Sequence, residues 1–546
     1  MAKYTIGVDF GTLSGRAVLV SLETGEEIAT AVYDYPHKVM ETALPCGKPL
    51  EKNSALQHPK DYTDALSHSV QEVMKISGIN PEDVIGIGID FTACTMFPVD
   101  DNGVPLCYQE KWASEPQAYV KLWKHHAAQA EADEITAMAK KEGKNWLERY
   151  GGKISSEWLF PKMLETIHKC PEVYHEATRF MEAGDWLTWL LTGKEIHSSC
   201  MAGYKGNWHH KEGYPDNEFL TKLHPDFDGV VGTKVSENVL PAGTLAGYLT
   251  EDSAAMLGLC PGTAVSVPLI DAFAALPAAD VTGSGKLMLV IGTSSCHILL
   301  SEKEQDVPGI CGVVKDGAVA GFYSYEAGQA CVGDHFAWFM DKCLPAEEKA
   351  QAEKEGKSVY ALMREKAEKL SPGESGIIAL DWWNGNRTPY VDANLSGVFL
   401  GMSLTTRPEE LYRALIEATA YGTKQIINTY EKGGVPTGEI IACGGIAEKD
   451  PFTMQIYADV CGRNIRVCAS PQAGALGSAM HASVASGYYK NLSDAAKVMA
   501  KLKDVVYTPI PEHTAVYEKL YAEYITLAEY FTKENQVMKR LMELRK

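Results

Sequence analysis

Residues 6–16 read IGVDFGTLSGR, a short apolar strand that ends near Asp9 and is followed by a Gly-Thr turn, a serine and an arginine. Gly7 and Gly11 permit close approach of other backbone and positive φ angles. The amides of the turn at 11–13 can point at phosphate oxygens. Asp9 is placed to hold Mg²⁺ through water, because that ion retains several waters. The stretch predicts a phosphate-binding turn, although an ordinary strand-to-turn junction has the same pattern.

The same pattern returns in the second half of the chain. After Thr-Gly-Ser-Gly at 282–285, a strand is expected at 287–291, a Gly-Thr-Ser-Ser turn at 292–295 and a returning strand at 296–300. An ordinary hairpin is the alternative interpretation of this segment. Together with residues 6–16, this repeated pattern indicates two domains of one topology, each of which offers one phosphate loop to a shared cleft.

Length and charge narrow the class of protein. A chain of 546 residues is longer than one core usually supports, so we predict two domains, residues 1–283 and 284–546. Apolar residues make up 45% and charged residues 22%, which is ordinary for a globular protein. The net charge of −20 argues against a nucleic-acid partner, which would need a basic face.

Cysteine usage and the first residues predict a cytoplasmic protein. The thirteen cysteines form no CxxC pair and no zinc-ligand spacing, so reduced thiols are expected. The start, MAKYTIGVDF, lacks the apolar region of a signal peptide. No apolar stretch is long enough to cross a bilayer, so no membrane partner is predicted.

Several further elements can be placed from periodicity. A helix over 59–77 has one apolar face and a closing glycine at 78, whereas residues 115–148 are charged, Ala-rich and also predicted to be helical. In the second half, a strand at 439–443 ends in Gly444-Gly445 and suits the approach of a flat ligand such as adenine. Other expected elements are strands at 4–8, 17–22, 84–89 and 95–99, a helix that Asp450 caps, a small-residue helix at 471–487 packed on the sheet, and a long helix at 513–546.

The block GVFLGMSLTTRPEELYRALIE at 397–417 resembles the C-terminal signature of the FGGY family of carbohydrate kinases. Its residues have a mainly structural interpretation, with a capping box from Thr406 to Glu409 and a buried helix face behind it. DWWNGNR at 381–387 and IDFTACT at 89–95 resemble stretches of the family's ketopentose-kinase branch. We interpret 381–387 as a marker of that branch and not as a catalytic group.

The resemblance implies an α/β fold, namely the two-domain actin-like ATPase fold with a mixed sheet flanked by helices in each domain. It implies phosphoryl transfer from ATP with Mg²⁺ to the terminal hydroxyl of a ketopentose, L-ribulose first, with D-ribulose, D-xylulose or glycerol as alternatives. A non-catalytic, ATP-switched protein of the hsp70 or actin kind is the alternative from another class. A small-molecule sugar is the implied substrate, and a homodimer is possible.

Asp271 is the predicted catalytic base. It follows the apolar run 265–270 and precedes an Ala-rich helical stretch, so it is expected at a strand end near a helix N-terminus. The alternative is that Asp271 only caps this helix. The family often has Asp-Ala-His here, whereas this chain has Phe273, which weakens any role for an imidazole beside the base.

The resemblance also implies the remaining site residues. Arg16 either neutralises the transferring group or pins its turn, and Asp450 fits a helix cap better than a nucleotide contact. The implied sugar contacts are Ala93, Lys205, Asp271 and Glu326; the nucleotide contacts are Gly11, Thr12, Arg16, Gly292, Thr293, Gly444 and Gly445; and Asp9 is the implied metal ligand.

Overall fold

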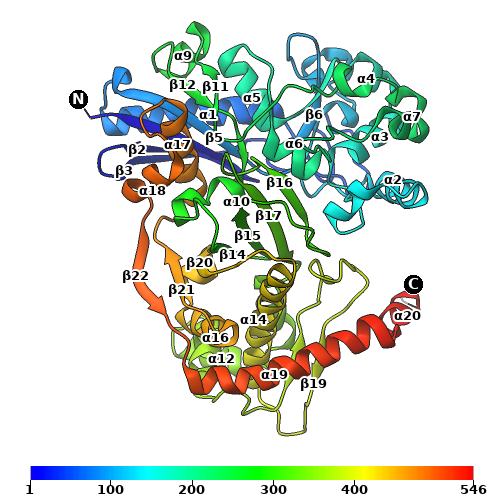
Figure 1. The fold of residues 1–546 in the computed structure, drawn as a ribbon, viewed down its shortest axis with the longest axis vertical. Helices are drawn as coiled ribbons and strands as arrows, with labels where there is room; N and C mark the ends of the chain where they lie inside the picture. Colours follow the sequence, from blue (N-terminus) through cyan, green and yellow to red (C-terminus); the bar gives the residue numbers. More distant parts are fainter. Residues whose placement is uncertain (1, 545–546) are drawn as a thin grey trace.

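The computed structural model describes residues 2–544 and contains two large β-sheets, one in each half of the chain (Figure 1). In the first sheet the strand order is β11-β12-β5-β1-β2-β3, and β13 also pairs with β5. The central strand β1 is antiparallel to β2 and parallel to β5. The strands are β1 (Tyr4–Phe10), β2 (Ser14–Ser21), β3 (Glu27–Asp34), β5 (Val84–Phe91), β11 (Leu245–Tyr248), β12 (Ala264–Ser266) and β13 (Leu269–Ile270).

The second sheet repeats this arrangement, in the order β16-β17-β15-β14-β20-β21-β22. Its central strand β14 is antiparallel to β15 and parallel to β20, as β1 is to β2 and β5. The predicted shared topology is therefore confirmed, with β16 as an added edge strand. The strands are β14 (Lys286–Ile291), β15 (Ser295–Ser301), β16 (Gly312–Lys315), β17 (Tyr323–Gln329), β20 (Glu439–Cys443), β21 (Ile465–Cys468) and β22 (Leu502–Tyr507).

The two phosphate-loop hairpins close in the same way. The amide of Gly11 donates to Ser14 O at 3.0 Å, and the amide of Gly292 donates to Ser294 O at 2.9 Å. The expectation of positive φ at Gly7 and Gly11 is wrong, because neither residue is among the glycines that have a positive φ angle. Gly7 serves a different need, which is close approach of a helix.

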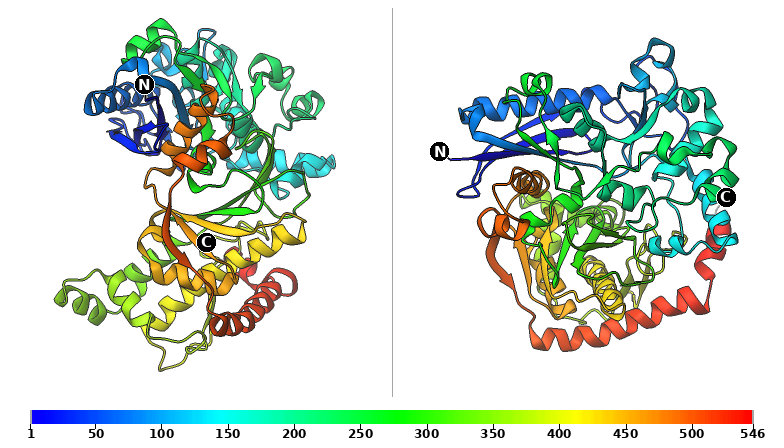
Figure 2. Two further views of the ribbon diagram at one scale, coloured as in Figure 1. Left: turned by 60° about the vertical axis from the view of Figure 1, so that its left-hand side comes forward. Right: turned by 45° about the horizontal axis from the view of Figure 1, so that its top comes forward.

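That helix is α17 (Ala473–Ala485), which comes late in the chain but packs on the first sheet, beside β1 and β5 (Figures 1 and 2). A Cβ at Gly7 would lie 1.7 Å from Ala475 O, and one at Gly88 would lie 2.1 Å from Ser478 O. Glycines in the strands thus let the helix backbone rest directly on the sheet. The predicted tight packing of this small-residue helix is confirmed.

Helix α1 (Pro59–Ser77) has the predicted bounds and ends at Gly78 with φ 63°. The prediction of helix throughout 115–148 is wrong. Only α2 (Gln129–Lys141) is α-helical there, because Pro116 begins a single 3₁₀ turn and the apolar residues after it form β7 (Val120–Lys121). This strand joins the four-stranded sheet β4-β7-β6-β8. The other three strands are β4 (Leu56–Gln57), β6 (Met96–Val99) and β8 (Arg179–Glu182).

Several short helices lie in the first half of the chain and at its junction with the second half. They include α3 (Leu159–Lys169), α5 (Ala183–Thr192), α6 (Ser199–Lys205) and α10 (Asp271–Ala274). Helix α10 directly follows β13, so the predicted strand end at Asp271 is confirmed. Pro268 separates β12 from β13, which explains why the apolar run is not one continuous strand.

The capping box of α14 (Pro408–Lys432) lies one residue later than predicted. The Arg407 amide donates to Glu410 Oε2 at 2.6 Å, whereas Thr406 Oγ1 accepts from the Ser403 amide. The single helix predicted over 513–546 is also wrong. Up to residue 544, where the described residues end, the chain forms α19 (Pro511–Glu529), a wider turn and then α20 (Val537–Leu544); α19 lies low in Figure 1 and α20 at its right-hand side.

The predicted helix cap at Asp450 is confirmed. Asp450 caps α16 (Pro451–Cys461) by accepting from the Thr453 amide at 3.2 Å. The thirteen cysteines are all free thiols. Within residues 2–544, no helix combines the length and the apolarity that a bilayer crossing requires.

Candidate active site

Three carboxylates come together where the first sheet meets α10 and α17. Asp9 and Asp90 are paired in register on the parallel strands β1 and β5, and Asp271 is the first residue of α10. Asp9 and Asp271 line a cavity of about 540 Å³, here called the carboxylate cavity. The sequence analysis missed Asp90 as a site residue; its place at the end of a strand parallel to that of Asp9 is the signal that would have found it.

Electrostatics set these carboxylates apart from surface acids. Burial raises the pKa of Asp9, although the Arg16 guanidinium opposes the rise. Burial and the charge of Asp9 raise the pKa of Asp90 well above its ordinary value. Burial and Asp9 also raise the pKa of Asp271 to about 7, while the amide of Ala272 opposes the shift. A carboxyl with a pKa near neutrality in a cavity is typical of a functional site.

The first phosphate loop borders the carboxylate cavity through Gly11 and Thr12. Its turn is braced from the first half of the chain, since Trp123 Nε1 donates to Thr12 Oγ1 at 3.2 Å. Arg16 is held nearby: its Nε lies 3.6 Å from Asp9 Oδ2, and its Nη1 donates to Gln472 Oε1 at 3.2 Å. These contacts favour the interpretation of Arg16 as a residue that pins the turn.

The second phosphate loop borders another cavity, of about 610 Å³, here called the Thr293 cavity. Gly445 lines both this cavity and the carboxylate cavity, so the two are adjacent. Gly444 has φ 94°, and a Cβ there would lie 2.5 Å from Ile291 O, so this position requires glycine. The Thr293 cavity is also lined by Gly292, Gly333, Tyr360, Arg364, Tyr412 and Asp450.

Lys205 and Glu326 meet in a third cavity of about 340 Å³, here called the Lys205 cavity. Lys205 ends α6 in the first half and Glu326 lies on β17 in the second; Lys205 Nζ is 3.6 Å from Glu326 Oε2. Although burial opposes it, Glu326 raises the pKa of Lys205, which stays charged. Glu326 Oε2 is buried and has no hydrogen-bond partner in residues 2–544, so it is free to accept one.

The segment interpreted as a branch marker contributes directly to the Lys205 cavity. Asn384, Asn386 and Arg387 all line it, together with Tyr150 and Trp158. Besides marking the branch, this segment therefore borders a cavity that also holds two predicted sugar contacts, Lys205 and Glu326. A guanidinium and two amides in seven residues are the signal that could have indicated this.

The remaining predicted sugar contact, Ala93, lines none of these three cavities in residues 2–544. It follows Thr92, which lines the carboxylate cavity, and precedes Cys94, which has φ 55°. A non-glycine residue with this φ is strained unless its surroundings hold it. The turn at 92–95 therefore depends on neighbouring groups.

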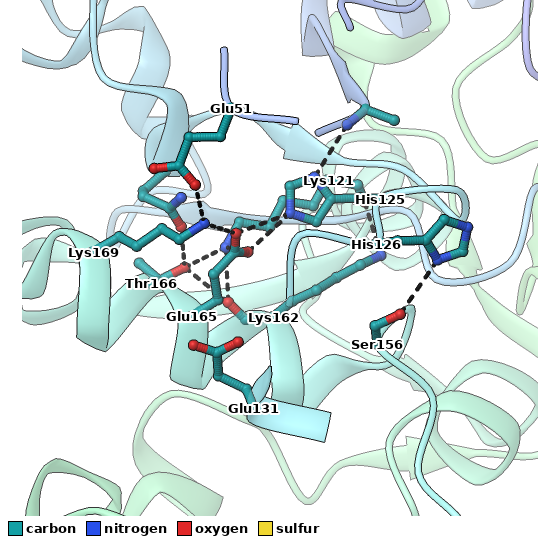
Figure 3. A network of polar contacts seen from close by, with 12 residues as sticks. Glu51, Lys121, His125, His126, Glu131, Ser156, Lys162, Glu165, Thr166 and Lys169 are labelled. Carbon is teal, nitrogen blue, oxygen red and sulfur yellow. Dashed lines mark hydrogen bonds and ion pairs between the residues drawn. The ribbon is translucent and has the colours of Figure 1, made fainter. Parts of the chain in front are cut away.

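Lys162 holds that turn from α3, in the network that Figure 3 shows. Its fully buried amine donates to the carbonyls of Cys94, Lys121 and Leu122. Burial lowers the pKa of Lys162. Removing this donor would leave three carbonyls without it and would release the 92–95 turn.

The rest of the network fixes strand β7, which carries Lys121 (Figure 3). Glu165 is fully buried and pairs with Lys121 Nζ at 2.8 Å, with His125 Nε2 at 2.9 Å and with Lys169 Nζ at 2.9 Å. Burial opposes ionisation of Glu165, but Lys121, His125 and Lys169 lower its pKa below the ordinary range. A buried charge held by several partners fixes geometry more than it adds stability.

Two sheets of one topology, two hairpin loops that face neighbouring cavities and a carboxylate cluster between them define the actin-like ATPase fold. Family models agree: residues 4–277 match the N-terminal domain of the FGGY family of carbohydrate kinases, and residues 287–486 match its C-terminal domain. This chain belongs to the FGGY family of carbohydrate kinases.

Individual relatives cover nearly the whole chain. It is 51% identical to a protein named ribulokinase from Bacillus licheniformis, over 98% of each chain. It is 52% identical to a ribulokinase from Halalkalibacterium halodurans, over 100% of this chain and 98% of that one. The solved structure of a xylulose kinase from Rhodospirillum rubrum has the same fold, with a TM-score of 0.79 at 22% identity over 97% of this chain and 99% of that one.

Proposed function

We propose that this chain is a ribulokinase, which transfers the γ-phosphoryl group of ATP to the terminal C5 hydroxyl of L-ribulose. The observation that carries the proposal is the position of Asp271, which lines the carboxylate cavity. The charges of Lys205 and Glu326, in the Lys205 cavity, also act on the pKa of this carboxyl. A base beside a polar sugar-sized cavity and two phosphate loops suits phosphoryl transfer to a hydroxyl. The names of the relatives support ribulose as the sugar.

ATP is assigned to the Thr293 cavity and the phosphates to the adjacent carboxylate cavity, because Gly445 belongs to both. The sugar is assigned to the Lys205 cavity, where Lys205 and Arg387 can donate to its oxygens and Glu326 can accept from its hydroxyls. Since Lys205 and Glu326 come from different halves of the chain, a bound sugar would contact both. Closure near residues 282–285 would then exclude water.

Asp9 and Asp90 suit a Mg²⁺ ion. Asp90 Oδ1 is buried without a hydrogen-bond partner in residues 2–544, and a Cβ at Gly474 would lie 3.3 Å from this oxygen and 3.6 Å from Asp9 Oδ2. The two carboxylates therefore lie close together and offer oxygen atoms that could coordinate the ion. When bound, Mg²⁺ would neutralise charge on the phosphates of ATP.

In the proposed reaction, Asp271 accepts the proton of the C5 hydroxyl as that oxygen attacks the γ-phosphorus. The new C5–O–P ester forms while the bond from phosphorus to the β,γ-bridging oxygen breaks, and ADP leaves with the electron pair. The amides of Thr12 and Thr293 would donate to phosphoryl oxygens, since the Gly11 and Gly292 amides of the same turns already close the two hairpins. Asp271 later releases its proton to water.

A substrate panel tests the assignment. Coupled ADP release should be fastest with L-ribulose when ketopentoses, ketohexoses and glycerol are compared at equal concentration. A flat profile, or a preference for D-xylulose or glycerol, would overturn the ribulose assignment but leave a carbohydrate kinase. A cytoplasmic location and a homodimer remain predictions, and sedimentation of the purified chain tests the second.

The pH dependence of kcat/KM for the sugar should follow the ionisation of Asp271. The pKa of Asp271 is raised from 3.8 to about 7, and the protonated carboxyl cannot act as a base, so the enzyme loses activity as the pH falls through this value. We expect kcat/KM to fall about tenfold per pH unit below that pKa. A kcat/KM that stays level from pH 8 down to about pH 5 would contradict the base assignment.

The Lys162→Met substitution should weaken sugar binding by loosening the 92–95 turn, which contains the predicted sugar contact Ala93. Its thioether fills similar space but cannot donate to Cys94 O. We expect KM for L-ribulose to rise by about tenfold or more, with KM for ATP changed by less than about twofold. The matched control is Lys169→Met, which removes a lysine from the partly exposed edge of the same network. If both constants rise together, Lys162 has a general structural role.

A further inference from the structure

Two adjacent histidines and a glutamate converge away from the carboxylate cavity. His209 and His210 lie in the loop after α6, and Glu304 lies in the segment after β15. One potential ligand atom from each residue lies within 4.8 Å of the other two. The ring of His209 approaches Glu304 most closely, with Nε2 3.1 Å from Oε1.

Both histidines have ring nitrogens that could coordinate a metal ion and that form no hydrogen bond within the described residues. The Nδ1 atoms of His209 and His210 are both buried without a hydrogen-bond partner in residues 2–544, and His209 is only 7% exposed. A buried polar atom without a partner is costly, so its retention calls for an explanation such as a bound ion. His210 Nε2 lies 3.3 Å from the hydroxyl of Tyr323.

We propose that His209, His210 and Glu304 bind a divalent transition-metal ion of the zinc class. Two imidazoles and one carboxylate form a common three-ligand zinc set that leaves a fourth position for water. Mg²⁺ and Ca²⁺ prefer all-oxygen sites and fit this set poorly. The spacing rules for zinc motifs miss the site, because Glu304 is 95 residues from His209.

Further charged side chains lie near the two histidines. Glu212 Oε1 lies 3.8 Å from His209 Nδ1 but is engaged by Arg149 at 2.6 Å. Lys315 is the nearby opposing charge, with its amine 4.8 Å from the centre of the Tyr323 ring.

A metal here would fasten the loop that follows Lys205 to the second half of the chain. Glu304 is anchored beside β17, since Tyr325 Oη donates to Lys303 O at 3.1 Å and accepts from the Gln305 amide at 2.6 Å. Strand β17 also carries Glu326. The ion would thus brace the wall of the Lys205 cavity without entering the carboxylate cavity, so its role would be to support the site and not to take part in phosphoryl transfer.

Metal titration of the full-length, untagged chain without ATP tests the site. We expect one equivalent of Zn²⁺ to remain after desalting and to raise the thermal midpoint. Co²⁺ should give visible absorption bands without the near-ultraviolet charge-transfer band of thiolate ligation, which separates this site from the exposed Cys46 and Cys343. Substoichiometric Zn²⁺, or a thiolate spectrum, would overturn the proposal.

Variants place the ion at these three residues. Glu304→Gln and His210→Gln should each weaken Zn²⁺ binding by at least about tenfold. His175→Ala is the matched control, because His175 forms an exposed pair with Asp226 at 3.3 Å but belongs to no group of three ligand atoms within 4.8 Å of one another in residues 2–544. Unchanged Zn²⁺ affinity in both Glu304→Gln and His210→Gln, or equal loss in His175→Ala, would contradict the assignment.

Discussion

Replacing Asp271 by asparagine is expected to reduce kcat for L-ribulose by about 10²–10⁴-fold, the contribution that general-base catalysis typically makes. Asparagine has nearly the same shape but cannot accept the hydroxyl proton. It also retains an Oδ1, which can still accept the hydrogen bond that Asp271 now receives from the Ala272 amide at 2.7 Å. The substitution therefore separates the base from the alternative role as a helix cap.

Calorimetric titration should find ATP and sugar binding changed by less than about threefold in Asp271→Asn, because the cavities keep their walls. Asp280→Asn is the control: Asp280 lies in the same segment, pairs with Lys286 at 2.5 Å and has φ 57°, which asparagine tolerates. Near-normal turnover of Asp271→Asn would show that the residue only caps α10.

The Gly7→Ala substitution is expected to have the largest effect on stability. The new Cβ would lie 1.7 Å from Ala475 O and 2.7 Å from the Ala479 amide nitrogen. Both contacts are with helix backbone, so no side-chain rotation can relieve them and α17 must move off the sheet. We expect a loss of about 4 kcal/mol or more, beyond the usual cost of overpacking.

Movement of α17 should also lower activity, since Ser478 Oγ on this helix donates to Asp90 Oδ2 at 2.6 Å. Thermal unfolding and proteolysis of Gly7→Ala, followed with and without ATP, measure the effect. Gly283→Ala is the control: its Cβ would meet only Phe322 at 3.9 Å. A thermal midpoint for Gly7→Ala equal to that of Gly283→Ala would mean that the helix does not rest on β1 as described.

Local signals allowed much of the fold to be predicted. Helix α1, its closing Gly78 and the Asp450 cap depend on residues a few positions apart, and both hairpins carry their own turn chemistry. The error at 115–148 has a local cause as well, because an Ala-rich, charged composition favoured helix over the short strand β7. There, pairing with β4 and β6 overrides helix propensity.

Much of the candidate site depends on long-range contacts, which the sequence did not predict. Asp90 gains its importance only when β5 pairs with β1 and Ser478 arrives from 388 residues away. Arg387 enters the Lys205 cavity through the fold of a loop, and Lys162 reaches the 92–95 turn across 68 residues. Spacing along the chain does not encode such contacts, whereas the family resemblance pointed to Asp271, Lys205 and Glu326, which line two of the cavities.

The position of the phosphate in the product tests the central claim most directly. After turnover of L-ribulose with ATP and Mg²⁺, phosphorus and carbon NMR should show one new ester on C5, equal in amount to the ADP formed. Asp271→Asn should form neither at a comparable rate. An ester on C1, or ADP and free phosphate without any sugar ester, would contradict the account.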